Sequence, residues 1–228
     1  MIIGGIQKTS TVDFPGVLSC VLFCRGCNLN CFYCHNRELI YPFGKSLDDQ
    51  SIWEFLNKRR GLLDGVVISG GEPTMQKDLK EFIAELKKLG YRVKLDTNGQ
   101  LPDRVKALCT DKLLDYAALD IKSTLFDYPS VCEGDGFMSA AETAEILAEN
   151  GVSYEVRTTL YPGLTADGLL LLLSSLPEMP LWRLNYFRMP NKYEEKDEER
   201  LREYALTPQD IEKRLPELLK IQPNLVYE

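Results

Sequence analysis

Residues 17–36 read Val-Leu-Ser-Cys-Val-Leu-Phe-Cys-Arg-Gly-Cys-Asn-Leu-Asn-Cys-Phe-Tyr-Cys-His-Asn, an apolar run followed at once by clustered cysteines. The apolar and β-branched side chains of the first seven residues predict a buried strand. Directly after it, Cys27, Cys31 and Cys34 stand at C-x3-C-x2-C spacing. Three thiols so close together form a set of soft metal ligands. A four-iron cluster normally takes four cysteines, so a set of three would leave one iron open.

The cysteine spacing is specific, because chance would place cysteines at both +4 and +7 after a given cysteine only about once in a thousand. The main alternative is a structural zinc site that also uses Cys24. Tetrahedral zinc prefers two separated C-x2-C pairs or a mixture with histidine. Here Cys24/Cys27 and Cys31/Cys34 lie within one short stretch, and no second zinc knuckle is present elsewhere in the sequence. His35, the only histidine, adjoins Cys34, which makes joint binding of one ion awkward. The other cysteines are expected to be inert packing residues: Cys20, Cys109 and Cys132.

Length and charge limit the class of protein. With 228 residues and 44% apolar composition, the chain is expected to form one domain over residues 1–228. A net charge of −7 argues against binding to nucleic acid or an anionic membrane. No apolar run is long enough to span a bilayer, and residues 1–6 do not resemble a secretory signal. Cysteines crowded together rather than spread along the chain indicate a reducing compartment, so a cytoplasmic location is expected.

After the cysteines, strand and helix patterns alternate along the chain. The predicted strands are residues 17–23, 65–69, 91–96, 114–121, 152–161 and 181–187. The predicted helices between them are residues 48–58, 79–90, 102–108, 139–150 and 165–176. We expect Ser46, a Ser139/Glu142 capping box and Thr165 to start three of these helices. Six such units predict an α/β fold, a single-domain incomplete (β/α)6 barrel with parallel strands, because a full eightfold barrel needs about 250 residues.

The predicted barrel core covers about residues 17–187, and two segments follow it. Residues 191–206 are highly charged, and a solvated loop or exposed helix is expected there. Residues 207–228 are expected to form a C-terminal helix that opens at Thr207-Pro208, with proline at its favoured first position. Pro216 is expected to interrupt or end that helix.

The chemically unusual residues all lie at the predicted strand ends. The cysteines follow the first strand, residues 69–73 follow the second and residues 96–99 follow the third. Asp120 and Lys122 close the fourth strand, and Arg157 lies within the fifth. Ligands of parallel α/β proteins bind at the carboxyl ends of the strands, so these elements are expected to meet at one site.

The C-x3-C-x2-C spacing, with Tyr33 before the third cysteine, resembles the signature of the radical S-adenosylmethionine (SAM) superfamily. This resemblance implies one [4Fe–4S] cluster, held by Cys27, Cys31 and Cys34. It also implies that S-adenosylmethionine binds the open iron through its amino and carboxylate groups.

Other segments resemble the cofactor contacts of the same superfamily. Residues 70–73 are similar to the segment that binds the methionine amino group, where glycines allow close approach to an ammonium and Glu72 complements it. The resemblance implies that Lys122 and Arg157 meet the cofactor carboxylate or ribose, and that Asp96 could hold a monovalent cation. Without the cysteines, these segments would be an ordinary turn and a surface ion pair. The implied cofactor-binding residues are Tyr33, Gly70, Gly71, Glu72, Pro73, Asp96, Thr97, Asp120, Lys122 and Arg157.

Two longer stretches, residues 11–16 and 26–37, resemble the proteins that activate glycyl radical enzymes. Residues 4–8 and the Cys-His-Asn-Arg ending look most like the activators of anaerobic ribonucleoside-triphosphate reductase. This resemblance implies that Asp13 and His35 lie near the glycine-bearing loop of the partner enzyme. Larger activators need about eight further cysteines for extra clusters, so one cluster is expected here.

The resemblance also implies an activity. Flavodoxin or ferredoxin would supply one electron, S-adenosylmethionine would be cleaved to a 5′-deoxyadenosyl radical, and that radical would abstract hydrogen from a glycine of the partner. Two alternatives stay open at this point. The partner could be pyruvate formate-lyase or another glycyl radical enzyme, or the chain could act on a small molecule, as the 7-carboxy-7-deazaguanine synthases do.

Anaerobic reconstitution with iron and sulfide should give a brown protein, and Cys27→Ala should abolish the colour because the cluster loses one of three ligands. Visible absorbance and iron content measure this. A variant that keeps its chromophore would contradict the cluster assignment, and a protein that binds zinc instead would support the alternative site.

Overall fold

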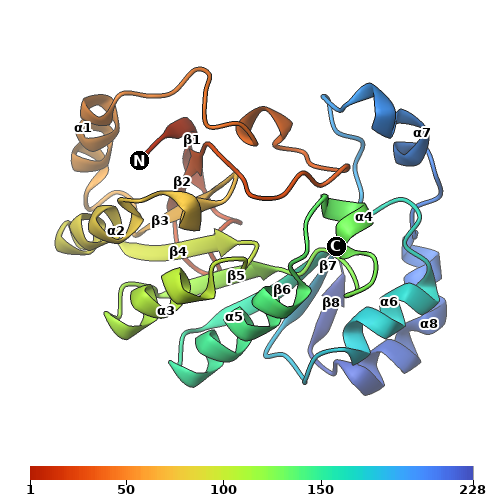
Figure 1. The fold of residues 1–228 in the computed structure, drawn as a ribbon. Helices are drawn as coiled ribbons and strands as arrows, with labels where there is room; N and C mark the ends of the chain where they lie inside the picture. Colours follow the sequence, from red (N-terminus) through yellow and green to blue (C-terminus); the bar gives the residue numbers. More distant parts are fainter. Residues whose placement is uncertain (228) are drawn as a thin grey trace.

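The computed structural model describes residues 1–227, which form one sheet of eight strands in the order β1 to β8 (Figure 1). The six strands expected from the sequence form its middle: β2 (Ser19–Cys24), β3 (Gly65–Gly70), β4 (Arg92–Thr97), β5 (Tyr116–Asp120), β6 (Tyr154–Leu160) and β7 (Trp182–Tyr186). Neighbouring strands from β2 onward are parallel. The expected open α/β barrel with parallel strands is therefore confirmed.

Two edge strands were not predicted. β1 (Ile3–Ser10) pairs antiparallel with β2, and β8 (Leu225–Tyr227) pairs parallel with β7. The sequence of β1 lacks the apolar pattern of a strand, because it contains a Gly4-Gly5 pair and its second half is polar. An edge position tolerates such residues. β8 has only three residues and lies in the segment expected to be helical. The expectation of one helix over residues 207–228 is therefore wrong for residues 222–227, and residue 228 lies outside the described part of the chain.

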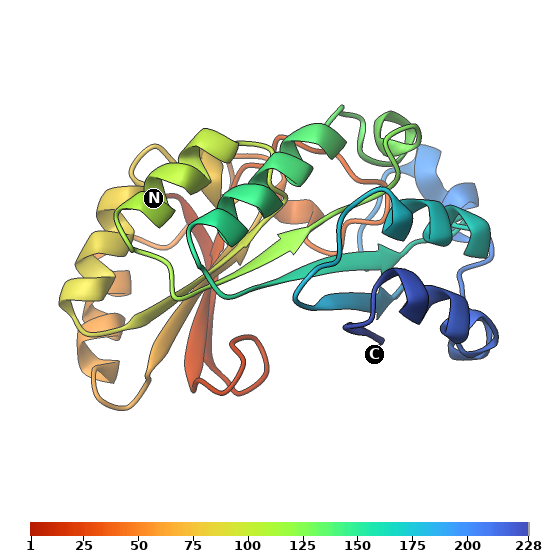
Figure 2. The ribbon, with the colours of Figure 1, turned by 90° about the horizontal axis from the view of Figure 1, so that it is seen from below.

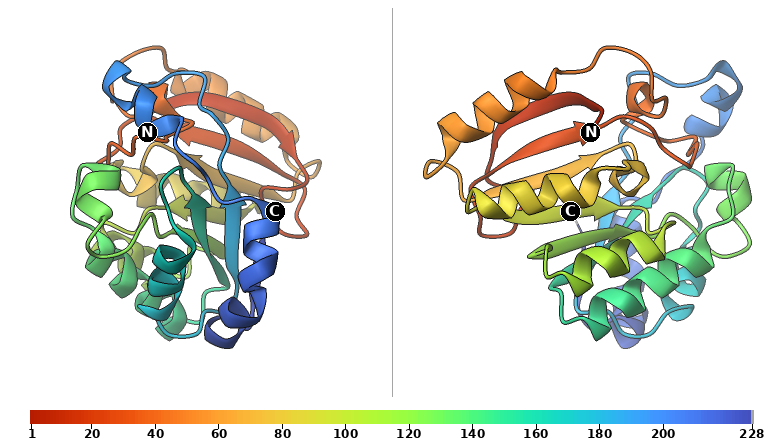
Figure 3. Two further views of the ribbon diagram at one scale, coloured as in Figure 1. Left: turned by 90° about the vertical axis from the view of Figure 1, so that its right-hand side faces the viewer. Right: turned by 60° about the vertical axis from the view of Figure 1, so that its left-hand side comes forward.

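The longer helices curve around the outer face of the sheet (Figures 2 and 3). They are α1 (Asp49–Arg59), α2 (Leu79–Lys88), α3 (Pro102–Thr110), α5 (Phe137–Glu149), α6 (Ala166–Ser174) and α8 (Pro208–Ile221). In α2 the side chains at positions 79, 82, 83 and 86 are buried, which is the stripe expected of a helix packed on a sheet. The main hydrophobic core lies between these helices and the sheet.

A smaller apolar cluster lies on the other side of the strands. The connection between β1 and β2 folds back so that Phe14 and Val17 pack against Val21 of β2 and Val67 of β3. Phe14 is fully buried there. These side chains close the amino-terminal part of the inner face, so the free space of the barrel is confined to the carboxyl ends of the strands.

Two of the expected helix caps are wrong. α1 is capped by Asp48, whose side chain accepts a hydrogen bond from the backbone N–H three residues on, and not by Ser46. α5 begins earlier than expected, with Gly136 at its N-cap, so Ser139 lies inside the helix and makes no capping box. The Thr165 cap of α6 is confirmed.

α8 begins at the expected position, and Thr207 and Asp210 form a reciprocal capping box. Pro216, however, lies inside the helix and does not end it. Proline removes one backbone hydrogen bond, but Ile211 and Leu218 on either side of it are buried, and the helix packs against α6. This packing holds the helical path through the proline.

Loss of the α8 cap should be measurable as lost stability. Thr207→Ala is expected to lower the free energy of unfolding by about 1 kcal/mol, because an N-terminal backbone N–H loses its acceptor. Thr110→Ala is a matched control, since that hydroxyl only donates to a carbonyl within α3, and its change should stay within about 0.5 kcal/mol. Urea unfolding measures both, and equal losses would contradict the capping role.

Candidate functional site

One cavity of about 280 Å³ opens at the carboxyl ends of the strands. Thirteen of the residues singled out from the sequence line it: Cys27, Cys31, Tyr33, Cys34, His35, Gly70, Gly71, Glu72, Asp96, Thr97, Asp120, Lys122 and Arg157. Pro73 begins the short 3-10 helix η2 (Pro73–Met75) and is buried beside the cavity without lining it. Segments at the ends of five strands, β2 to β6, thus meet where the parallel sheet predicts a ligand site.

The cysteine loop, residues 24–36, is held by backbone hydrogen bonds from two later segments. The N–H of Cys27 donates to Ile40 O (2.8 Å), just after the 3-10 helix η1 (Arg37–Leu39). The N–H of Asn30 donates to Cys132 O (2.8 Å), at the end of α4 (Tyr128–Cys132). Cys31 is buried, while Cys27 and Cys34 are half-buried at the cavity wall. The loop therefore presents its three thiols to one space.

The thiols resist ionisation in the protein without metal. Burial raises the pKa of Cys27 to about 12 and raises that of Cys34 as well. The pKa of Cys31 is raised by its hydrogen bond to Cys132, whose sulfur lies 3.2 Å away, and by burial. Cys132 was expected to be a packing residue and is fully buried, but it also contacts the thiol of Cys31. Metal binding must therefore release protons here.

The placement of the thiols does not support a site for a single zinc ion. Within residues 1–227, no three His, Cys, Asp or Glu side chains are placed to hold one metal ion. A zinc site needs its ligands around one point, whereas each cysteine of a four-iron cluster binds a different iron. Cys24, the extra ligand of the zinc alternative, is fully buried in β2 and does not line the cavity. The three remaining thiols all line the cavity.

The glycine turn after β3 packs directly against the cysteine loop. Gly70 has φ of +115°, and an added Cβ would lie 2.4 Å from the backbone N of Cys24. A Cβ on Gly71 would lie 2.2 Å from Gly26 O. The N–H groups of Gly71 and Glu72 donate to Cys24 O and Gly26 O, at 2.9 and 2.7 Å. The glycines thus allow a close contact between this turn and the cysteine loop.

Glu72 connects the ends of two strands, β3 and β4, through hydrogen bonds. Its buried carboxylate accepts hydrogen bonds from Thr74 N (3.0 Å), Thr97 Oγ1 (2.7 Å) and Asn98 N (2.7 Å). Burial raises its pKa, and these hydrogen bonds act against that rise. Asn98 was not among the expected site residues, although it lines the cavity and its side chain donates to Asn28 Oδ1 (2.8 Å). The position of Asn98 in the turn after a predicted strand is the feature of the sequence that could have indicated a place in the site.

A row of charges forms the far wall of the cavity. Asp120 Oδ1 accepts from Arg157 Nε (2.8 Å), and its Oδ2 accepts from Lys122 Nζ (2.9 Å). Arg157 also lies 3.5 Å from Asp96 Oδ2. Burial alone would raise the pKa of Asp120, but the charges of Arg157 and Lys122 hold it well below its usual range. The wall therefore stays charged at neutral pH, and Lys122 and Arg157 remain cations that can receive a carboxylate.

The two residues expected at the partner loop are not both at the cavity. His35 lines it, whereas Asp13 lies in the connection between β1 and β2, where its side chain accepts from Ser10 Oγ. Tyr33 stacks on Tyr161, with ring centroids 5.4 Å apart, and its buried hydroxyl has no hydrogen-bond partner among residues 1–227. Asp13 thus does not line the cavity, and Tyr33 keeps one polar atom available.

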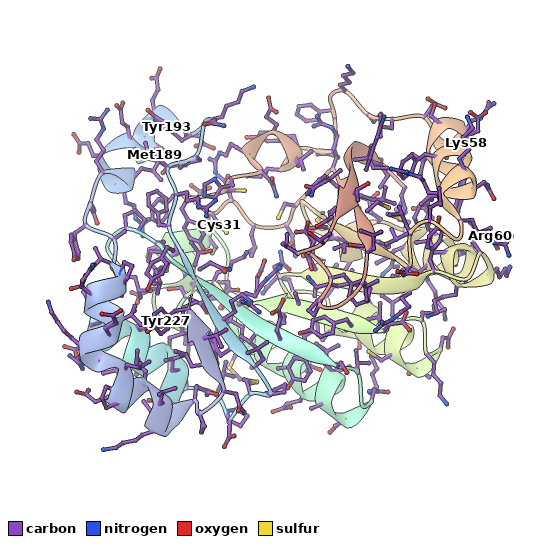
Figure 4. All side chains as sticks on the ribbon, turned by 180° about the vertical axis from the view of Figure 1, so that it is seen from behind. Cys31, Lys58, Arg60, Met189, Tyr193 and Tyr227 are labelled. Carbon is purple, nitrogen blue, oxygen red and sulfur yellow. The ribbon has the colours of Figure 1, made fainter. Side chains whose placement is uncertain are left out.

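The charged segment of residues 191–206 is not simply solvated. It contains the 3-10 helix η3 (Glu195–Asp197) and α7 (Glu198–Leu201), and Figure 4 labels its residue Tyr193 as well as Cys31 of the cysteine loop. Arg37 donates to Cys31 O (3.0 Å) and pairs with Glu194 and Asp197 of this segment. The segment therefore contacts the cysteine loop from outside through Arg37.

The fold and the sequence define the class of protein. The sequence matches the radical SAM superfamily over residues 21–176, and the chain belongs to that superfamily. Its fold is similar to that of Streptococcus suis SuiB bound to S-adenosylmethionine, with a TM-score of 0.65 at 14% identity over 91% of this chain and 51% of that one. It is also similar to anSMEcpe with bound AdoMet, with a TM-score of 0.64 at 19% identity over 86% and 57% of the two chains. At these identities the likeness shows the fold.

Two curated proteins narrow the class. The chain is 32% identical over 232 aligned positions to a Methanocaldococcus jannaschii protein named "Putative glycyl-radical enzyme activating enzyme", covering 99% of this chain and 93% of that protein. It is 31% identical over 175 positions to the pyruvate formate-lyase-activating enzyme of Staphylococcus aureus, covering 71% and 69%. The chain belongs to this family of activating enzymes. No helix within the described part of the chain is long and apolar enough to cross a membrane.

Replacing Gly70 should disturb the cysteine loop far more than replacing a glycine elsewhere. Gly70→Ala forces a Cβ into the backbone of β2 and is expected to cost more than about 3 kcal/mol, above the penalty of about 1–2 kcal/mol for a positive φ. Gly90→Ala is the matched control, because its φ is +89° and its Cβ would meet nothing within 4 Å. Urea unfolding and iron content after reconstitution measure the difference, and similar results for both variants would contradict the packing role.

Proposed function

We propose that this protein activates a glycyl radical enzyme, with anaerobic ribonucleoside-triphosphate reductase as its partner. The observation that carries this proposal is the meeting of three thiols, a glycine turn and a charged wall in one cavity, in a chain that belongs to the activating-enzyme family. The family implies a [4Fe–4S] cluster and S-adenosylmethionine. When bound, these groups would supply a 5′-deoxyadenosyl radical that takes hydrogen from a partner glycine.

The chain's own residues would bind and orient these groups. Cys27, Cys31 and Cys34 would hold the cluster, and the close contact of the glycine turn keeps their loop against the sheet. Lys122 and Arg157 would face the carboxylate of the methionine group, because Asp120 holds both cations at the cavity wall. The protein's contribution is therefore position and exclusion of water rather than proton transfer.

The glycine turn would bind the methionine amino group through backbone carbonyls and Glu72. The carboxylate of Glu72 already accepts several hydrogen bonds, so its charge would act mainly through the field it places on the cavity. Thr97 and Tyr33 would border the same ligand, and the hydroxyl of Tyr33 has no partner within the described residues.

A polypeptide substrate is favoured by the surroundings of His35. A second cavity of about 210 Å³ is lined by His35 and Asn36, which also line the main cavity, and by Gly4 and Gly5 of the edge strand β1. An extended chain segment could pass along this surface toward the cofactor site. Asp13 would meet the partner elsewhere on the connection between β1 and β2. The reductase is preferred over pyruvate formate-lyase because residues 4–8 and 34–37 resemble the reductase activators.

The same proposal assigns a one-electron donor of the flavodoxin or ferredoxin type and a cytoplasmic setting. Free, clustered thiols support a reducing compartment. The net charge of −7 supports a role without nucleic acid.

Incubation of the reduced, reconstituted protein with S-adenosylmethionine and the host's anaerobic ribonucleoside-triphosphate reductase should produce a glycyl radical, measured by electron paramagnetic resonance. Cys31→Ser should give no signal because it loses a cluster ligand, and a reductase whose radical glycine is replaced by alanine should give none either. Radical formation only with pyruvate formate-lyase would reassign the partner. Formation of 5′-deoxyadenosine without a glycyl radical on any such enzyme of the host would favour a small-molecule substrate.

A further inference from the structure

Lys94 stands apart from the other lysines within residues 1–227, because only 2% of its surface is exposed. It lies in the middle of β4, between the buried residues Val93 and Leu95, and points to the inner face of the sheet with Asp96. Taking an ammonium out of water is costly unless other groups compensate it. Lys94 does not line the cofactor cavity, so a contact with the cofactor cannot account for its position.

The surroundings of Lys94 are those of a bound cation. Its Nζ lies 2.9 Å from Asp96 Oδ1 and 3.9 Å from Glu155 Oε1, and it donates to the backbone oxygen of Asp13 (2.7 Å). The ring centroid of Tyr116 lies 5.9 Å away. Two carboxylates, a carbonyl and an aromatic face are the groups that also surround hard cations and ammonium ions in proteins.

Asp96 has a cation near each of its oxygens. Lys94 Nζ lies 2.9 Å from Oδ1 as an ion pair without hydrogen-bond geometry, since this buried oxygen has no hydrogen-bond partner within the described residues. Arg157 lies 3.5 Å from Oδ2. The side chain of Asp96 lines the cavity while that of Lys94 does not, so Lys94 can reach the cofactor only through Asp96. A free monovalent cation on Oδ1 would have to compete with an ammonium attached to the chain.

We propose that the ammonium of Lys94 is a resident cation that takes the place of a free monovalent cation beneath Asp96. It acts as a positioning residue: it holds the Asp96 carboxylate at the cofactor cavity and balances Glu155 behind it. Because the cation is covalently attached, its occupancy does not depend on the salt of the medium. This inference rests on the proposed cofactor site but not on the identity of the partner enzyme.

The first test uses the wild-type, full-length, reconstituted protein. Its affinity for S-adenosylmethionine is measured by calorimetry in potassium chloride and in choline chloride at equal ionic strength, since choline is too large for the space around Asp96. The two affinities should agree within about twofold, because potassium has no site of its own beside Asp96 through which it could change the affinity for the cofactor. An affinity about tenfold higher in potassium would overturn the proposal and indicate a free cation.

The second test removes the ammonium. Lys94→Met keeps most of the apolar stem and vacates the place of the nitrogen, so that Asp96 and Glu155 lose a shared counter-charge. In choline chloride the affinity should fall by about tenfold, and potassium should restore most of it as an external replacement. A fall that potassium does not reverse would overturn the resident-cation role and leave a purely structural lysine.

A cofactor-free measurement separates this inference from the proposed function. The thermal unfolding midpoint of the cluster-free Lys94→Met variant should rise in potassium relative to choline, while that of the wild type should not. Lys88→Met is the matched control, because it removes the same charge from a side chain of α2 that is 70% exposed. If the variant does not fold, the wild-type comparison still decides. If S-adenosylmethionine does not bind, the proposed function fails while the unfolding comparison still tests Lys94.

Discussion

The cysteine loop depends on the close contact between the Gly70-Gly71 turn and the backbone at the end of β2. There is no space for a Cβ at either glycine, and two N–H groups of the turn donate to carbonyls of the loop. The loop consequently leaves the sheet in one direction, with its thiols at the carboxyl ends of the strands. Arg37 and the segment that carries Glu194 then hold it from the opposite side.

A second constraint is the charge buried on the inner face of the sheet. Apolar side chains around Phe14 fill the lower part of this face, and ion pairs occupy the part toward the cavity. Each buried cation there has a carboxylate within about 4 Å, which offsets its loss of hydration. The pairing leaves Arg157 and Lys122 charged and fixed in direction, so the cavity offers cations without a side-chain rearrangement.

Much of this arrangement could be predicted from local patterns. The six central strands are short apolar runs in the sequence. The spacing of the cysteines indicates metal binding without a structure. β1 could not be predicted because an edge strand tolerates glycines and polar residues, and β8 because it has only three residues within a segment expected to be helical. The contacts of residues 191–206 could not be predicted, because a run of charged residues is normally solvated. In addition, the ion pair between Glu194 and Arg37 joins residues that are far apart in the chain. The contacts of Lys94 could not be predicted, because the alternation of side chains along a strand indicates which face a residue occupies but not which residues it contacts.

The residue order alone thus establishes which side chains follow which strands, and with them a cluster of three cysteines at the mouth of a parallel sheet. These features depend on spacing within a few residues, which a sequence displays directly. It does not reveal that Asp120 lies between two cations, that Glu72 already accepts several hydrogen bonds, or that Lys94 reaches Asp96 and Asp13. Those contacts come from strand register and from the folding of distant connections onto one face, because both depend on packing across the whole sheet.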